Sequence, residues 1–225
     1  MNTMTYSKDA ALIQNELMQR RITHLCHFTT FKNVRSIFKM GGLYSRQTLK
    51  VCDVDVDIQD DSRHEGAHYI NLSIHEVNFK LLSRFAGNQP NKEWCILRLR
   101  KEICMCSGVR FATDNAAAWR VRRYGTAEGV SGLKALFAES VPTKDVYLPR
   151  KANKPMYLPT SSQAEVLCPE PIALRDVMDV MVLSWGAKQR LANEYGIPET
   201  LVKVGWNYFP SMLRSRSYEG IDVVF

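Results

Sequence analysis

The sequence of 225 residues lacks the long apolar runs that would place it in a membrane. No apolar stretch reaches the roughly 18 residues that a membrane-spanning helix needs. The opening MNTMTYSKDA has neither the basic start nor the apolar run of a signal peptide, so we expect a cytoplasmic protein without a membrane partner. The six cysteines are Cys26, Cys52, Cys95, Cys104, Cys106 and Cys168. They form no C-x-x-C pair and no Cys/His cluster, which predicts reduced thiols and no metal site.

The best-known catalytic and nucleotide-binding fingerprints are also missing. The chain contains no G-x-x-x-x-G-K-[ST], and GTAEGVSG at 125–132 does not fit G-x-G-x-x-G. It contains neither a G-x-S-x-G elbow nor an H-E-x-x-H helix. If the protein binds a nucleotide, it therefore does so without a P-loop or a Rossmann turn.

What the sequence does have is a local excess of positive charge. The formal net charge is +7, and residues 98–154 hold twelve Lys and Arg against five Asp and Glu, which is the whole surplus. A concentrated basic face attracts polyanions, because neutralising phosphates releases counterions. The alternative is a basic surface that only keeps the protein in solution.

Short helical and strand patterns are mixed along the chain without regular alternation. Helical periodicity covers 8–20, 31–38, 77–85, 114–125, 130–137 and 187–196, and strand patterns cover 22–28, 68–75, 93–100, 164–168 and 176–184. Residues 51–66 and 140–162 read as loops, the second long and exposed. We find no repeat and no linker, so we expect one α+β domain over 1–225.

The segment HFTTFKNVRSIF places a histidine and a threonine where a strand meets a helix. Thr29 or Thr30 can cap the helix, and Gly41-Gly42 can end it. The pattern gives His27 no comparable structural role. Taken alone, it could be an ordinary core histidine.

Four segments, in this order, resemble the DarT family of nucleic-acid ADP-ribosyltransferases. They are HFTTFKNVRSIFKMGGLYSR, then DIQDDSRHEG before YINLSIHEVNF, then WCILRLRKEI before FATDNAAA, and last LPTSSQAEVLCPEPI. The second and third are more similar to the guanine-modifying branch than to the thymine-modifying one. The resemblance implies an ADP-ribosyltransferase fold, in which a split pair of antiparallel β-sheets with flanking helices grips NAD. It also implies that NAD is consumed as a substrate.

The resemblance also assigns roles to residues. Glu165 is implied as the catalytic glutamate, and a carboxylate there would stabilise an oxocarbenium-like ribose. Arg63 matches the family arginine and would hold the pyrophosphate or the acceptor base. His27 and Thr29 would bind NAD. Asn33 would either touch NAD or steady the loop, and Arg46 would bind phosphate.

The acceptor surface is expected in two basic segments that also carry aromatic residues. Cations follow a nucleic-acid backbone while aromatic rings stack on bases. The candidates are Arg120, Arg122, Arg123, Tyr147, Arg150, Lys151 and Lys154.

Three readings of the function remain open at this stage. The first is a toxin of a toxin–antitoxin or phage-defence system that modifies guanine or thymine in single-stranded DNA, countered by a macrodomain-type antitoxin. The second is the same enzyme acting on RNA, because the sequence does not reveal whether a 2′-hydroxyl is read. The third is a non-catalytic nucleic-acid-binding protein with a transferase fold.

Overall fold

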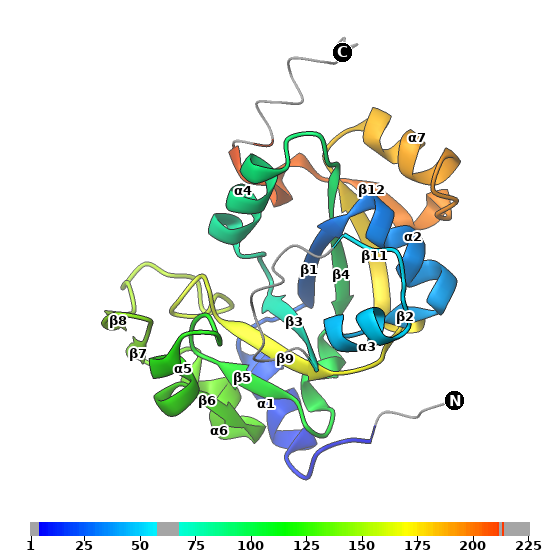
Figure 1. The fold of residues 1–225 in the computed structure, drawn as a ribbon. Helices are drawn as coiled ribbons and strands as arrows, with labels where there is room; N and C mark the ends of the chain where they lie inside the picture. Colours follow the sequence, from blue (N-terminus) through cyan, green and yellow to red (C-terminus); the bar gives the residue numbers. More distant parts are fainter. Residues whose placement is uncertain (1–4, 58–67, 212, 214–225) are drawn as a thin grey trace.

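The computed structural model describes residues 5–57, 68–211 and 213, and shows a large sheet flanked by helices (Figure 1). The strand order in the eight-stranded sheet is β12-β11-β4-β1-β3-β9-β5-β6. Neighbouring strands are antiparallel except for β11 and β12. Two small sheets, β10-β2 and β7-β8, complete the described strands. The architecture is the α+β fold that the sequence predicted.

The described elements have the following bounds. The strands are β1 (His24–Thr30), β2 (Gly42–Leu43), β3 (Tyr69–Ile74), β4 (Trp94–Arg100), β5 (Arg110–Ala112), β6 (Thr126–Glu128), β7 (Ser140–Pro142), β8 (Tyr147–Pro149), β9 (Glu165–Pro169), β10 (Ile172–Ala173), β11 (Val177–Val182) and β12 (Val202–Val204). The helices are α1 (Ala10–Gln19), α2 (Phe31–Met40), α3 (Arg46–Val51), α4 (Phe79–Asn88), α5 (Trp119–Tyr124), α6 (Gly129–Ala135) and α7 (Trp185–Asn193). Short 3₁₀ turns span Lys101–Met105, Leu174–Asp176, Glu199–Leu201 and Trp206–Tyr208.

Both faces of the central strands are buried, and α2 and α4 lie on opposite sides of β1 and β4 (Figure 1). Leu25 and Leu97 belong to the core cluster that includes residues of α2 and α7. Their chain neighbours Cys26 in β1 and Ile96 in β4 belong to the cluster around α4. Successive side chains of a strand point to opposite faces, so an apolar run such as WCIL fills both clusters.

The sheet is forked between β1 and β3. Strand β1 pairs with β4 along its whole length, from His24 to Thr30. Its register with β3 consists of Leu25–Ile74 and Cys26–Ser73. Beyond these pairs the two strands separate, and β3 continues by pairing with β9. The fork divides the sheet into two parts, as the predicted split sheet pair requires, and it leaves room for a ligand.

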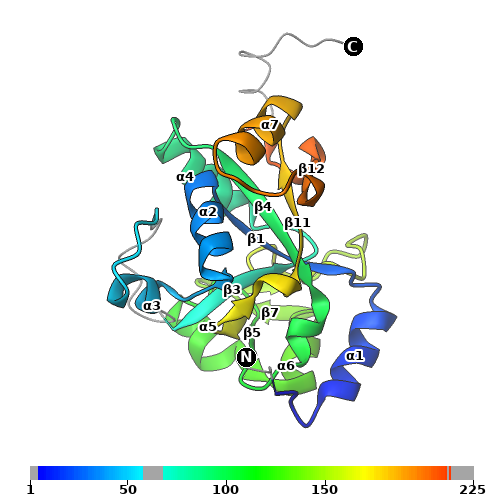
Figure 2. The ribbon, with the colours of Figure 1, turned by 90° about the vertical axis from the view of Figure 1, so that its right-hand side faces the viewer.

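The two glycines after α2 have different jobs. Gly41 takes the left-handed conformation, with φ of 75°, that ends the helix. Gly42 lies in β2 against β10, where a Cβ atom would stand 2.5 Å from the carbonyl oxygen of Ile172. At the other end of α2, Thr30 is the N-cap, since its side chain accepts a hydrogen bond from the amide of Asn33. The close approach at Gly42 fixes where the chain turns away from α2 toward α3 (Figure 2).

One loop prediction was wrong. Residues 140–162 were expected to form a long exposed loop, but β7 and β8 pair within it, and Val141, Thr160 and Ser161 are buried. The composition, rich in Pro, Lys and Ser, hid a hairpin that packs beside α5. Among the described helices, none is both long and apolar enough to cross a membrane.

Candidate functional site

A cavity of about 250 Å³ opens at the fork in the sheet. Its walls come from β1, β3, α2, α3 and the first residue of β9. It brings together five of the six residues predicted for catalysis or NAD binding, which are His27, Thr29, Asn33, Arg46 and Glu165. Arg63, the sixth, lies outside the described residues. Segments separated by more than a hundred residues in the chain thus meet around one space.

Glu165 is held rigidly at the edge of this cavity. It is 6% exposed, and its Oε2 accepts a hydrogen bond from the amide of Ala116 at 2.9 Å. Ala116 belongs to the segment FATDNAAA that carried part of the family resemblance. Extending the Leu72–Val166 register by one residue brings Ser73 opposite Glu165 on the same face of the sheet. A buried carboxylate fixed in this way is preorganised to stabilise nearby positive charge.

His27 presents a neutral imidazole to the cavity. Its Nδ1 lies 3.0 Å from the carbonyl oxygen of Asn71, which can only accept, so Nδ1 carries the proton and Nε2 is left as an acceptor. Burial lowers the pKa of His27, an effect that outweighs the hydrogen bond to Asn71. The ring can therefore accept a hydrogen bond from a hydroxyl of a bound sugar. Asn71 acts through its backbone, and no side-chain pattern could have indicated it.

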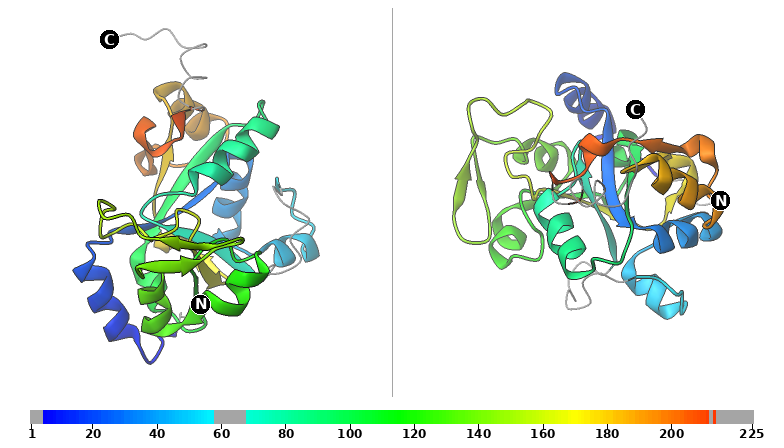
Figure 3. Two further views of the ribbon diagram at one scale, coloured as in Figure 1. Left: turned by 90° about the vertical axis from the view of Figure 1, so that its left-hand side faces the viewer. Right: turned by 90° about the horizontal axis from the view of Figure 1, so that it is seen from above.

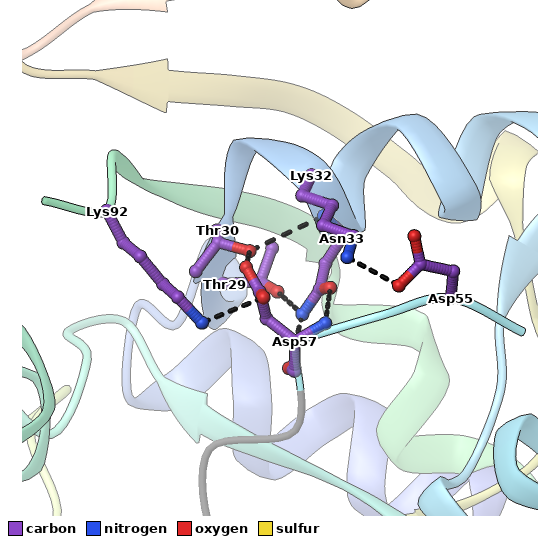
Figure 4. Close-up of polar contacts among 7 residues, drawn as sticks. All are labelled: Thr29, Thr30, Lys32, Asn33, Asp55, Asp57 and Lys92. Atoms are coloured by element: carbon purple, nitrogen blue, oxygen red, sulfur yellow. Dashed lines mark hydrogen bonds and ion pairs between the residues drawn. The ribbon is translucent and has the colours of Figure 1, made fainter. Parts of the chain in front are cut away.

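Asn33 clamps the chain beyond α3 onto the start of α2 (Figure 4). Its Nδ2 donates to Thr29 Oγ1 at 3.0 Å and to the carbonyl oxygen of Asp57 at 2.9 Å. Its Oδ1 accepts from the amide of Asp57 at 2.7 Å. Of the two roles considered for Asn33, these contacts favour steadying the loop, and they also orient the Thr29 hydroxyl in the cavity.

Asp57 completes the network shown in Figure 4. Its carboxylate accepts from Thr30 Oγ1 at 2.8 Å and pairs with Lys92 Nζ at 2.8 Å. Burial alone would raise the pKa of Asp57, but the hydrogen bonds from Lys92 and Thr30 outweigh it and lower that pKa. Asp57 and Lys92 are not among the residues predicted from the sequence. Their partners lie 27 and 35 positions away, so no local pattern joins them.

Arg46 begins α3 at the cavity wall. Ser45 caps this helix by accepting from the amide of Thr48. The amide of Ser45 and the hydroxyl of Thr48 both donate to the carboxylate of Glu170. Glu170 follows directly after β9, so the strand that starts with Glu165 also anchors the helix that carries Arg46. This arrangement is consistent with the predicted phosphate-binding role of Arg46.

The seven residues predicted to bind the acceptor lie on α5, on the β7-β8 hairpin and in the loop after it, and these elements are at the opposite end of the molecule from α7 (Figures 1 and 3). The guanidinium of Arg120 lies 5.7 Å from the ring centre of Trp119 and 6.0 Å from that of Tyr147. These two rings are 57% and 56% exposed. Arg122, Arg123 and Lys151 are also exposed. The surface therefore has the pairing of cations and aromatic rings that single strands favour.

Arg150 and Lys154 have a different position from the other candidates. Arg150 donates to the carbonyl oxygens of Leu158 and Pro155 at 3.0 and 2.8 Å, and Lys154 Nζ donates to that of Thr160 at 2.9 Å. Both cations thus hold together the loop that leads into β9. A role in nucleic-acid binding stays a prediction for all seven candidates, and for these two it would be shared with loop structure.

Comparisons with known proteins identify the family and the fold. Residues 26–209 match the family described as "ssDNA thymidine ADP-ribosyltransferase, DarT". No curated protein matches the sequence.

Solved structures have a similar fold. DarTG of Thermosipho africanus, in complex with ADP-ribose, has a TM-score of 0.57 and 16% identity, covering 83% of this chain and 51% of its own. This chain therefore spans about half of that one. DarT of Thermus sp. 2.9, in complex with NAD⁺, has a TM-score of 0.56 and 14% identity, covering 92% of this chain and 100% of its own. The same Thermus protein with ADP-ribosylated ssDNA gives 0.54 and 13%, covering 84% and 97%.

Proposed function

The chain belongs to the DarT family, and on that premise we propose that it transfers ADP-ribose from NAD to a base of single-stranded DNA in the cavity at the fork. The class of reaction follows from the family. One observation carries its assignment to this site: Glu165 of β9 lines the same cavity as His27 and Thr29 of β1, although the two strands lie far apart in the sequence. Solved relatives with NAD⁺ and with ADP-ribosylated ssDNA support both substrates.

The residues of the cavity suit a dinucleotide that is cleaved at its nicotinamide ribose. His27 Nε2 and the Thr29 hydroxyl offer hydrogen bonds to sugar hydroxyls, and Arg46 offers a cation to the pyrophosphate. No group of His, Cys, Asp and Glu suited to a metal ion occurs among the described residues. In this proposal NAD is consumed as a substrate.

In the transfer step, the lone pair of an acceptor nitrogen forms a bond to C1′ of the nicotinamide ribose. The bond from C1′ to nicotinamide breaks, and its electron pair neutralises the pyridinium ring. The acceptor nitrogen loses its proton, for which the Glu165 carboxylate is the nearby base. Before that, the same carboxylate stabilises the positive charge that develops on the sugar.

The surface of α5 and the β7-β8 hairpin is proposed to bind the DNA strand. Trp119 lies three residues after Ala116, whose amide holds Glu165, so the strand would reach the reaction centre directly from this surface. The Nε of Arg120 has no hydrogen-bond partner among the described residues, although it is buried. Protein atoms cover this nitrogen, so the strand would contact the rest of the guanidinium and the exposed rings of Trp119 and Tyr147.

Finer parts of the proposal rest on the sequence resemblance. We propose guanine as the base, a role as a toxin of a toxin–antitoxin or phage-defence system, and a cytoplasmic protein countered by a macrodomain-type antitoxin. The DarTG relative supports an antitoxin partner, and the macrodomain type rests on the sequence resemblance alone.

The decisive experiment combines the protein with NAD and separate single-stranded DNA and RNA oligonucleotides, followed by mass spectrometry of the products. One added ADP-ribose on DNA, with free nicotinamide in equal amount, is the expected result. Labelling of RNA alone would mean that the acceptor is RNA and not DNA. The absence of a product with either oligonucleotide would refute the proposed activity.

A further inference from the structure

A second cavity, of about 140 Å³, lies between the end of β3, the start of α4 and the loop before β9. Part of its lining is apolar, with Phe79 and Leu158 among the side chains. Its polar side chains are those of Ser73, Glu76, Lys80, Lys154, Ser161 and Ser162. Apolar walls with a few polar groups are typical of pockets that bind small planar molecules.

The second cavity adjoins the first. Ser73 lines both of them, and the register of β3 with β9 brings it opposite Glu165. Ala164, which also lines the second cavity, directly precedes Glu165. Ser161 fixes this part of the loop by donating to the carboxylate of Asp114. A group bound in the second cavity would therefore lie about one side chain away from the catalytic carboxylate.

Glu76 is the chemically distinctive residue of this cavity. In the part of the chain that the structure describes, no N–H or O–H group donates a hydrogen bond to its carboxylate. Lys80 and Lys154 are the cations that line the cavity, and Lys154 already donates to the carbonyl oxygen of Thr160. Glu76 is exposed overall, but partial desolvation of its carboxyl in the cavity raises its pKa, against the opposing effect of Lys154. A carboxylate in this position is stabilised by a ligand that supplies N–H donors.

We propose that this cavity receives the acceptor base and that Glu76 selects a base with two adjacent N–H donors, which is guanine. The inference rests on the proposed function above. Guanine presents N1–H and N2–H side by side, and both can donate to one carboxylate. Thymine presents one N3–H between two carbonyl oxygens, and the carboxylate repels those oxygens. The site would thus favour guanine over thymine.

The test uses two single-stranded oligonucleotides of adenine and cytosine that carry either one guanine or one thymine. The unmodified protein is expected to label the guanine strand. Glu76→Gln should slow this transfer roughly ten- to a hundredfold, since the amide replaces one acceptor oxygen with a donor. Calorimetric affinity for a non-reactive NAD analogue should not change. Glu194→Gln, an exposed glutamate at the end of α7, is the matched variant and should transfer at the normal rate.

A second variant tests the cavity itself. Ser162→Phe places a ring in the space for the base and should block transfer while NAD still binds. Ser131→Phe, at an exposed position of α6, should not block transfer. Normal guanine labelling by both Glu76→Gln and Ser162→Phe would overturn the inference, as would labelling confined to the thymine strand. In either case the labelled DNA still supports the proposed function. The absence of any labelled strand with the unmodified protein would refute both.

Discussion

At the scale of single residues, Glu165 differs from an ordinary strand glutamate because a backbone amide fixes its carboxylate. We expect Glu165→Gln to lower the transfer rate roughly a hundred- to a thousandfold, the usual effect of removing one preorganised electrostatic group. Glutamine keeps the shape and the acceptor for the Ala116 amide, so the melting temperature should change little. The measurement is the initial rate of DNA labelling, with Glu128→Gln on exposed β6 as the comparison. Near-normal turnover by Glu165→Gln would remove Glu165 from the mechanism.

His24, outside the cavity, makes stability depend on pH. It is buried against His75, and its Nδ1 lies 2.7 Å from Thr23 Oγ1. Burial, followed by the charges of His75 and Arg98, lowers the pKa of His24 from 6.5 to about 4, against the opposing effect of Asp179. Between these values the unfolded chain binds a proton that the folded chain does not. The free energy of unfolding therefore falls as the pH falls.

We expect this residue to cost about 3 kcal/mol of stability between pH 7 and pH 4. Chemical unfolding at a series of pH values measures the effect. His24→Gln should flatten the dependence over this range, and His68→Gln, at an exposed position, should leave it as it is. Parallel curves for His24→Gln and the unmodified protein would contradict the assignment.

At the scale of elements, the side-chain amide of Asn33 joins the start of α2 to the segment before residue 58. Asn33→Ala removes two donors and one acceptor from Thr29 and Asp57, so buried polar groups lose their partners. We expect a loss of about 1–3 kcal/mol of stability and a weaker affinity for NAD. Chemical unfolding and calorimetry with a non-reactive NAD analogue measure the two effects. Asn193→Ala, at the exposed end of α7, should change neither quantity. An unchanged NAD affinity in Asn33→Ala would mean that the hydrogen bonds of Asn33 do not affect NAD binding.

The elements that the sequence predicted well are those whose periodicity comes from their own burial. Strand β4 and helix α2 each contact the core along their length, so their apolar spacing is visible in the chain. Strands β2 and β10 have two residues each and exist only because they meet one another. The predictability of the site also differs from residue to residue. Glu165 and His27 could be predicted because they lie in recognisable segments, whereas Asn71 and Ala116 contribute backbone groups that any residue possesses.

At the scale of the whole molecule, the basic end should dominate binding to DNA. Each phosphate neutralised on a single strand adds about −0.7 to the slope of log affinity against log salt. Replacing Arg122, Arg123 and Lys151 together by alanine should flatten that slope, because these side chains are exposed near α5 and the hairpin. Arg150 and Lys154 are poor choices for this test, since they hold the loop together.

Fluorescence anisotropy of a short oligonucleotide at several salt concentrations gives the slope. A triple variant with the same change in net charge elsewhere, Arg35, Lys39 and Lys203 to alanine, should bind as the unmodified protein does. Equal slopes for the two triple variants would mean that DNA affinity depends on the total charge of the protein and not on where the basic residues lie.

The fork in the sheet also predicts an unusual pattern of amide hydrogen exchange within one strand. Phe31 donates its amide to Glu93, next to β4, and amides alternate between the two edges of a strand, so those of His27 and Thr29 also point toward β4. The amide of Phe28 points the other way, to the side where β3 has separated. Phe28 should therefore exchange quickly between two slowly exchanging neighbours, and a dinucleotide filling the cavity should slow it. One backbone amide would then report whether the site is occupied, without any change to the ligand.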